Sequence, residues 1–147
     1  MKELGAHHVV DHAKPLAPQI DALGLGAPSF VFSTTNTEQH LGDIVELIAP
    51  QGRFALIDDP KTLDINPFKR KSVSVHWELM FTRSLFNTAD IAEQGKLLGD
   101  VAQLVDAGTI RTTQAAHFGK IDAENLKRAH AAIETGRTKG KIVLEGF

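Results

Sequence analysis

The stretch Ser29–Asp58, SFVFSTTNTEQHLGDIVELIAPQGRFALID, decides the fold of this chain. It opens with the apolar run Phe30–Phe32, which ends abruptly in small polar residues from Ser33 onward. Such a run predicts a buried strand that ends at a loop. A second apolar run, Phe54–Ile57, follows the turn Pro50–Gly52 and ends in two aspartates. The two runs therefore predict two strands, one in the first part of the stretch and one in the last.

The residues between the two predicted strands have the spacing of an amphipathic helix. One stripe contains, at positions i, i+3, i+4 and i+7, Leu41, Ile44, Val45 and Ile48. Either Asn36 or Thr37 stands where an N-cap would satisfy the first free N–H groups. A strand, a crossover helix and a second strand predict a parallel βαβ unit. Because such crossovers are right-handed, the polar ends of both strands lie at one edge of the sheet, where open α/β sheets bind their ligands.

The composition limits the class of protein. The chain has 147 residues, of which 42% are apolar and 23% charged, as in an ordinary globular domain. Its net charge of −2 gives no electrostatic reason to expect nucleic acid or an anionic membrane as a partner. No apolar run reaches the length of about eighteen residues that a membrane span needs. The absence of cysteine removes disulfide and thiolate chemistry, and we expect a cytoplasmic location.

Outside the central stretch, strands and helices alternate, which predicts an α/β fold. Before it we expect a last helical turn over Met1–Ala6 with Gly5 as C-cap, a strand over His7–His12 and a helix over Pro15–Leu23. After it we expect a strand over Ser72–Met80, an aromatic-rich loop over Phe81–Phe86, a helix from Thr88 or Asp90 to Gly108, an extended segment within Thr109–Lys120, a helix over Asp122–Thr135 and a strand over Lys141–Leu144.

Four pieces taken together resemble the medium-chain dehydrogenase/reductase superfamily, especially its quinone-oxidoreductase-like and zinc-type alcohol dehydrogenase-like members. They are ELGAHHVVDH (3–12), PSFVFSTTNTEQHLGDIVELIAPQGRFALID (28–58), KRKSVSVHWELMFTRSLF (69–86) and ENLKRAHAAIETGRTKGKIVLEGF (124–147). The resemblance covers essentially the whole chain in order and spacing. It implies that the chain is the C-terminal part of a nucleotide-binding Rossmann domain, and that the segment from about 81 to 147 returns to complete it.

The resemblance implies a doubly wound parallel sheet with strand order 3-2-1-4-5-6. His7–His12 would be strand three, Ser29–Thr34 strand four, Arg53–Asp58 strand five and Ser72–Met80 strand six. The chain contains no glycine-rich phosphate turn, and we expect the first two strands of the Rossmann domain to be missing as well. Strands three and four would then each lose a neighbour and expose unpaired backbone. We therefore expect either repair by association or membership in a larger protein.

The same resemblance implies an NAD(P)H-dependent oxidoreductase that transfers a hydride to a quinone, enone or carbonyl, with NADP(H) favoured over NAD(H). Ser33, Thr34, Ile57 and Asp58 would line the nicotinamide side of the cofactor pocket. Met80 and Phe81 would offer backbone groups to the carboxamide, because strand ends on one edge expose free N–H and C=O groups. Lys139 and Lys141 would place cations near the phosphates, although a solvated basic turn is the stronger reading for this pair.

No catalytic acid or base can be assigned from these residues, and the fragment alone is expected to be inactive. The competing hypothesis is a non-catalytic association module derived from a truncated Rossmann domain. Relatives pair strand six across a two-fold axis, so we expect a homodimer through Ser72–Met80; simple packing of that strand under the following loop is the alternative.

Three other groups of residues invite a chemical reading and are better explained as structure. The seven histidines have no cysteine to support them, and His8 and His12 would be far apart along a strand, so no metal site is expected. Asp58 and Asp59 are expected to face solvent rather than to work as an acid–base pair. The basic run Lys69–Lys71 is expected to be a solvated entry into the next strand.

Overall fold

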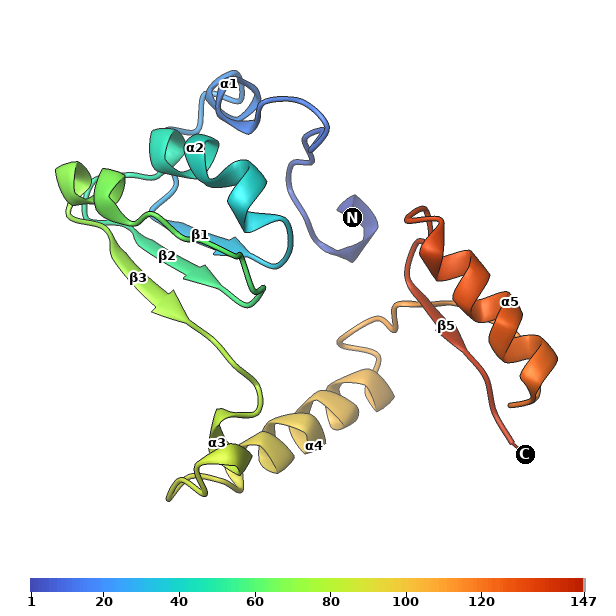
Figure 1. Ribbon diagram of the computed structural model, residues 1–147. Coiled ribbons are helices and arrows are strands. Elements are labelled where there is room, and N and C mark those ends of the chain that lie inside the picture. The colour runs from blue at the N-terminus through green and yellow to red at the C-terminus, as the bar shows by residue number, and fades with distance from the viewer. Residues whose placement is uncertain (147) are drawn as a thin grey trace. The chain divides into compact units, whose positions relative to one another are not determined.

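The computed structural model describes residues 1–146, and these form two compact units that divide between Ile91 and Ala92. Each unit contains helices and a small sheet in which all strand pairs are parallel (Figure 1). The predicted α/β class is therefore confirmed.

The first unit contains the predicted βαβ arrangement. Its elements are a 3₁₀ turn over Lys2–Leu4, α1 (Leu16–Asp21), β1 (Phe30–Ser33), α2 (Thr37–Leu47), β2 (Arg53–Leu56), a 3₁₀ helix over Asn66–Lys71, β3 (Ser74–Trp77) and α3 (Thr82–Leu85). The sheet has the order β1-β2-β3. Phe30 lies opposite Arg53, which in turn lies opposite Ser74, so the three strands are in register from their first residues.

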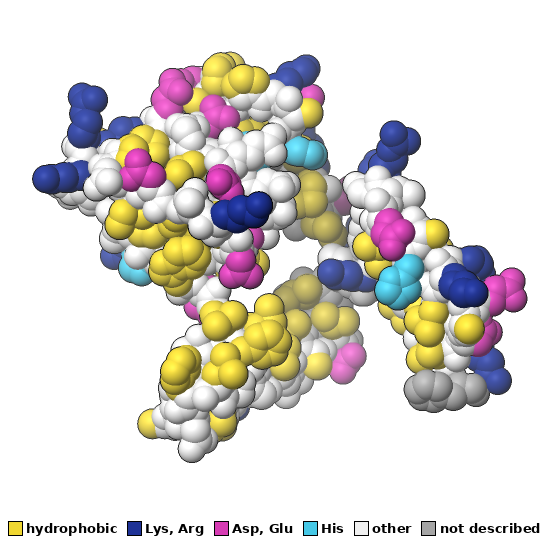
Figure 2. Space-filling model, in the orientation of Figure 1, with side chains coloured by type: hydrophobic (Ala, Val, Ile, Leu, Met, Phe, Trp, Pro, Cys, Tyr) yellow, Lys and Arg dark blue, Asp and Glu magenta, His cyan; other side chains and the backbone are white. Residues whose placement is uncertain are grey.

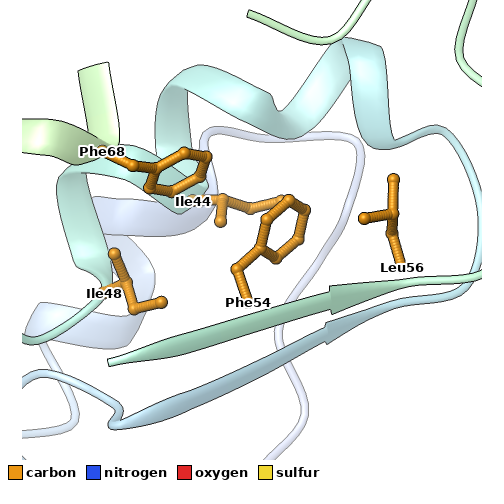
Figure 3. Packing of buried hydrophobic residues seen from close by; sticks show 5 residues of the cluster. All are labelled: Ile44, Ile48, Phe54, Leu56 and Phe68. Atoms are coloured by element: carbon orange, nitrogen blue, oxygen red, sulfur yellow. The ribbon is translucent and has the colours of Figure 1, made fainter. Parts of the chain in front are cut away.

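The core of this unit lies between α2 and one face of the sheet. Five apolar side chains form its buried cluster, namely Ile44, Ile48, Phe54, Leu56 and Phe68 (Figure 3). The rings of Phe54 and Phe68 stack with their centroids 5.3 Å apart. Ile44 and Ile48 belong to the helical stripe read from the sequence, and the other two members of that stripe pack against the cluster. The predicted orientation of α2 is thus confirmed.

The turn between α2 and β2 depends on a glycine. A Cβ at Gly52 would lie 2.8 Å from the carbonyl oxygen of Ala49 and 2.8 Å from Cγ1 of Ile48. These distances are too short for any side chain, so only glycine lets β2 begin directly beneath the end of α2. Arg53 then donates its N–H to the Ser29 oxygen at 2.8 Å, which starts the β1–β2 ladder.

Two elements of the first unit differ in kind from the sequence expectation. His7–His12 forms no strand in the structure. A strand needs a neighbour to satisfy its backbone groups, and the implied neighbour of this segment is not part of the chain. Phe81–Phe86, expected to be a loop, contains the short helix α3, whose N-cap is Phe81.

Strand β1 lies at an edge of the sheet, as expected for a strand that has lost a neighbour. Its backbone pairs with β2 on one side, and none of the other described strands pairs with its outer side. Phe30 and Phe32 point away from the α2 face and are 71% and 61% exposed. These exposures are high for phenylalanine in a central segment of an α/β fold.

The second unit contains α4 (Glu93–Asp106), β4 (Gln114–His117), α5 (Ala123–Glu134) and β5 (Lys141–Val143). Helix α5 begins as predicted, because the Asp122 side chain accepts a hydrogen bond from the Asn125 N–H at 2.8 Å. Helix α4 begins later than expected, but it ends before Gly108, whose φ is +71°, as predicted. Strand β4 lies inside Thr109–Lys120, where an extended segment was expected, and pairs with β5.

Helix α4 presents an apolar stripe that the other described residues of its unit leave partly exposed. Its members, each between 38% and 62% exposed, are Leu97, Leu98, Val101, Leu104 and Val105. Figure 2 shows hydrophobic side chains gathered over this helix. Whether this second unit completes the Rossmann domain stays a prediction. Across residues 1–146, no helix combines the length and the apolar character that crossing a membrane requires.

Candidate functional site

The carboxyl ends of the three parallel strands form one rim of the first sheet. Ile57 donates its N–H to the Ser33 oxygen at 3.2 Å, and Glu78 donates its N–H to the Leu56 oxygen at 3.1 Å. These bonds continue the ladder just past the last strand residues. The residues that follow β1, β2 and β3 therefore lie on a common rim, as the βαβ pattern predicts.

Thr37 joins the ends of β1 and β2 at this rim. Its hydroxyl lies 2.7 Å from Oγ of Ser33 and donates a hydrogen bond to Oδ1 of Asp58. Its backbone N–H donates to Oδ2 of Asp58 at 2.9 Å. Thr37 is fully buried and Ser33 is 9% exposed, so the two hydroxyl groups are shielded from water, whereas Asp58 is half-buried. Two of the predicted cofactor-binding residues, Ser33 and Asp58, are thus brought together by a third residue.

The network gives Asp58 a structural role. Asn36 is the N-cap of α2, in a left-handed conformation, but its side chain makes no capping bond. Asp58 supplies the cap instead, because its carboxylate accepts the N–H of the first helical residue. The hydrogen bonds from the Thr37 hydroxyl and N–H hold the pKa of Asp58 below its usual value. Asp59 is exposed, as expected, whereas Asp58 is half-buried, because its carboxylate points to the start of α2.

A groove of about 500 Å³ lies beside β1 and between α1 and α2. Its wall is mostly apolar and its polar part is the loop that follows β1. It is lined by His12, Leu16, Ile20, Pro28, Phe30–Asn36, His40, Ile44 and Leu47. An apolar groove with a few converging polar groups is the usual form of a small-molecule site. Ser33 and Thr34 lie where the groove meets the rim.

The other predicted site residues of the first unit lie at the rim with less support. Thr34 and Ile57 are exposed and follow β1 and β2 directly. Met80 and Phe81 are exposed and lie just beyond β3. The carbonyl of Phe81 already accepts bonds from the Leu85 N–H and the Ser84 hydroxyl, at 2.8 and 3.0 Å. That carbonyl is therefore committed to α3.

Lys139 and Lys141 lie in the second unit, on either side of Gly140, and both are exposed. Lys141 is the first residue of β5, and its N–H donates to the Thr113 oxygen at 2.8 Å. The proposed contact of these two cations with cofactor phosphates therefore stays a prediction.

Sequence reasoning missed one further cation. Lys71 was expected to be solvated with its neighbours, but its Nζ donates to three carbonyl oxygens at the end of α2, those of Val45, Glu46 and Ile48, at 3.0, 2.6 and 2.7 Å. A cation at this end stabilises the helix dipole and satisfies its last carbonyls. Asp58 and Lys71 therefore hold α2 at opposite ends. Both contacts join residues more than twenty positions apart, and no local pattern signals them.

The fold and the rim are those of part of the cofactor-binding domain of medium-chain alcohol dehydrogenases. A family model described as zinc-binding dehydrogenase matches residues 4–144, so the chain belongs to that family. The "Zinc-type alcohol dehydrogenase-like protein SAS2087" of Staphylococcus aureus is 28% identical over 144 residues. The match covers 97% of this chain and 43% of that protein.

Solved structures agree with this membership. A Rhizobium etli protein described as a zinc-dependent alcohol dehydrogenase is 62% identical, with a TM-score of 0.91 over 99% of this chain and 43% of that one. CurA of Vibrio vulnificus, solved in complex with NADPH, shares the fold at 16% identity, with a TM-score of 0.69 over 97% of this chain and 44% of that one. The chain thus spans less than half the length of the proteins that it matches.

The family name implies zinc, and the residues of this chain do not fit that metal. The sequence contains no cysteine. The resemblance implies that the zinc sites of this family include cysteine ligands. Within residues 1–146, no group of three or more histidine, aspartate or glutamate side chains is arranged to hold a metal ion.

Proposed function

We propose that this chain is the C-terminal part of the cofactor domain of an NAD(P)H-dependent oxidoreductase. The observation that carries the proposal is the rim itself: Ser33 and Asp58, from the ends of adjacent parallel strands, are joined through Thr37, and Ser33 also lines an apolar groove. In open α/β sheets this edge is the place where a dinucleotide binds. Family membership and the NADPH complex of CurA support the choice of ligand.

In the proposed site, Ser33, Thr34 and Ile57 line the nicotinamide side of the pocket, and Asp58 holds that lining in place. Met80 and Phe81 offer backbone groups to the carboxamide, with the Phe81 N–H as the donor, since its carbonyl serves α3. Lys139 and Lys141 lie near the phosphates. NADP(H) is the favoured cofactor, and a quinone, enone or carbonyl is the favoured acceptor. When bound, the cofactor supplies the hydride, while this chain orients and shields the ring.

The proposal predicts that the chain needs further protein for tight binding, because the phosphate-binding glycines of a Rossmann site are not in its sequence. A chimera tests this requirement. The matching segment of the Rhizobium etli protein is replaced by this chain, and NADPH and NADH are titrated while tryptophan fluorescence is followed. We expect saturable binding in the micromolar range by the chimera and none in that range by the isolated chain. A folded chimera, verified by circular dichroism, that binds neither nucleotide would refute the proposal.

We include in the same proposal a homodimer that forms through β3. The alternative function is a non-catalytic module that only associates with another chain. Strand β3 is the other edge of the sheet, and Ser74 and Glu78 direct their N–H groups toward β2. Because N–H directions alternate along a strand, those of Val75 and Trp77 point to the outer edge. Val75 itself packs against the core, so the dimer would form through the backbone and not through a Val75 side-chain interface. The cytoplasm stays the expected location.

A further inference from the structure

The hydrogen bonds around Thr37 have a fixed direction. A threonine hydroxyl carries one proton, and an ionised carboxylate can only accept. The Thr37 hydroxyl donates to Asp58, and its proton is therefore unavailable for its other neighbour, Ser33. The 2.7 Å contact between the two hydroxyl oxygens must then use the proton of Ser33. The chain of donation runs from Ser33 to Thr37 to Asp58.

Two features keep this direction from reversing. Thr37 also gives its backbone N–H to the same carboxylate, so Asp58 faces two donors from one residue. These bonds lower the pKa of Asp58, which keeps it ionised and acceptor-only at neutral pH. Thr37 is fully buried, which excludes water as a competing partner for its hydroxyl.

We propose that Thr37 is a positioning residue that commits the proton of Ser33 inward, so that Ser33 Oγ presents only lone pairs to the groove beside β1. Ser33 lines that groove and retains 9% of its surface. A ligand group that reaches Ser33 must therefore donate a hydrogen bond. An amide N–H₂ or a ribose hydroxyl satisfies this requirement, whereas a carboxylate or phosphate oxygen does not.

This inference rests on the proposed function for the identity of its ligand, and it deepens that function by assigning a polarity to one contact. Ser33 Oγ, which can only accept a hydrogen bond, selects a primary carboxamide over the matching carboxylate on the same aromatic ring. A carboxylate that met Ser33 would place acceptor against acceptor, in a region that already contains the negative charge of Asp58.

The direction of donation can be tested without any ligand. Neutron diffraction from deuterated crystals of the 147-residue chain locates the deuterium between Ser33 and Thr37. We expect it on Ser33 Oγ, directed at Thr37 Oγ1, with a second deuterium between Thr37 and Asp58. A deuterium on Thr37 that points at Ser33 would overturn the inference.

The consequence for binding is tested with nicotinamide and nicotinate, which differ in the donor amide and the acceptor carboxylate. Millimolar titrations followed by ¹H–¹⁵N spectra of the chain give the ratio of their dissociation constants. We expect nicotinamide to bind more tightly, Thr37→Val to narrow the ratio by about threefold to tenfold, and Thr37→Ser to preserve it. Thr37→Val leaves the charge of Asp58 in place, so any purely electrostatic part of the preference remains.

Two outcomes of this titration would refute the inference. If Thr37→Val weakens both probes equally, Thr37 only supports the fold. If neither probe shifts the Ser33 or Thr34 signals of the wild-type chain, the groove is not a donor-selective site. The NADPH titration of the chimera is independent of both results, so failure here can be distinguished from failure of the proposed function.

Discussion

Asp58 accepts both the backbone N–H and the hydroxyl of Thr37, so the residue that follows one strand caps the helix that precedes it in the chain. The contact joins β2 to α2 at the same rim where β1 ends. A carboxylate at the start of a helix satisfies a free N–H group and interacts favourably with the helix dipole. The ionised Asp58 therefore ties the start of α2 to the end of β2 at the proposed site.

Removal of this cap is expected to destabilise the first unit. Asp58→Ala should lower the free energy of unfolding by about 1 to 2 kcal/mol, because the N–H and the hydroxyl of Thr37 lose their partner inside the protein. Urea denaturation followed by circular dichroism measures the change. Asp59→Ala is the matched control, since Asp59 is exposed, and it should stay within about 0.5 kcal/mol of wild type. Equal effects of the two substitutions would contradict the capping role.

The cap also predicts a dependence on pH. The pKa of Asp58 is lower in the folded chain than in the unfolded one, so its charge stabilises the fold above the unfolded value of about 3.9. That contribution is lost as the pH falls through the folded pKa. The difference in unfolding free energy between wild type and Asp58→Asn should therefore be largest near neutral pH and shrink below about pH 4. A difference that grows on acidification would show that the assigned sign is wrong.

The opposite end of α2 gives a second stability test. Lys71→Met keeps most of the aliphatic stem but leaves three carbonyl oxygens without their cation, and it should cost about 1 to 2 kcal/mol. Lys69→Met changes an exposed lysine of the same 3₁₀ helix and should be nearly neutral. Thermal melts of the two variants beside wild type measure both effects. A loss that is the same for both would point to net charge and not to the cap.

The proposed dimer is tested at the outer edge of β3. Trp77→Pro removes an N–H that points away from β2, so the sheet of the monomer should survive while pairing with a second copy is blocked. Trp77→Thr removes the same indole but keeps the N–H. Analytical ultracentrifugation should find a dimer for wild type and Trp77→Thr, and a monomer for Trp77→Pro. Dimers of all three, or a monomeric wild type, would refute pairing through this strand.

Local patterns predicted the elements whose contacts are local. The helical stripe of α2 and the apolar runs of β1 and β2 come from residues a few positions apart. These three elements are all present in the structure. Asp122 caps α5 three residues away, within the range that a sequence pattern can report.

The failures concern contacts between residues far apart in the chain. His7–His12 has the composition of a strand, but a strand forms only where a neighbour accepts its hydrogen bonds. Thr37 was read as one of two candidates for a local cap, and its role as the junction of two strand ends depends on Asp58, 21 residues away. The groove beside β1 likewise depends on how α1 and α2 pack, which no single motif determines.

The proposed function requires that the ends of these strands hold the nicotinamide ring. The most direct measurement uses the chimera with isotope-labelled isoleucine and methionine methyl groups and saturating NADPH. We expect nuclear Overhauser effects from the nicotinamide ring protons to the methyl groups of Ile57 and Met80. Effects confined to methyl groups of the second unit, such as that of Ile133, would contradict it.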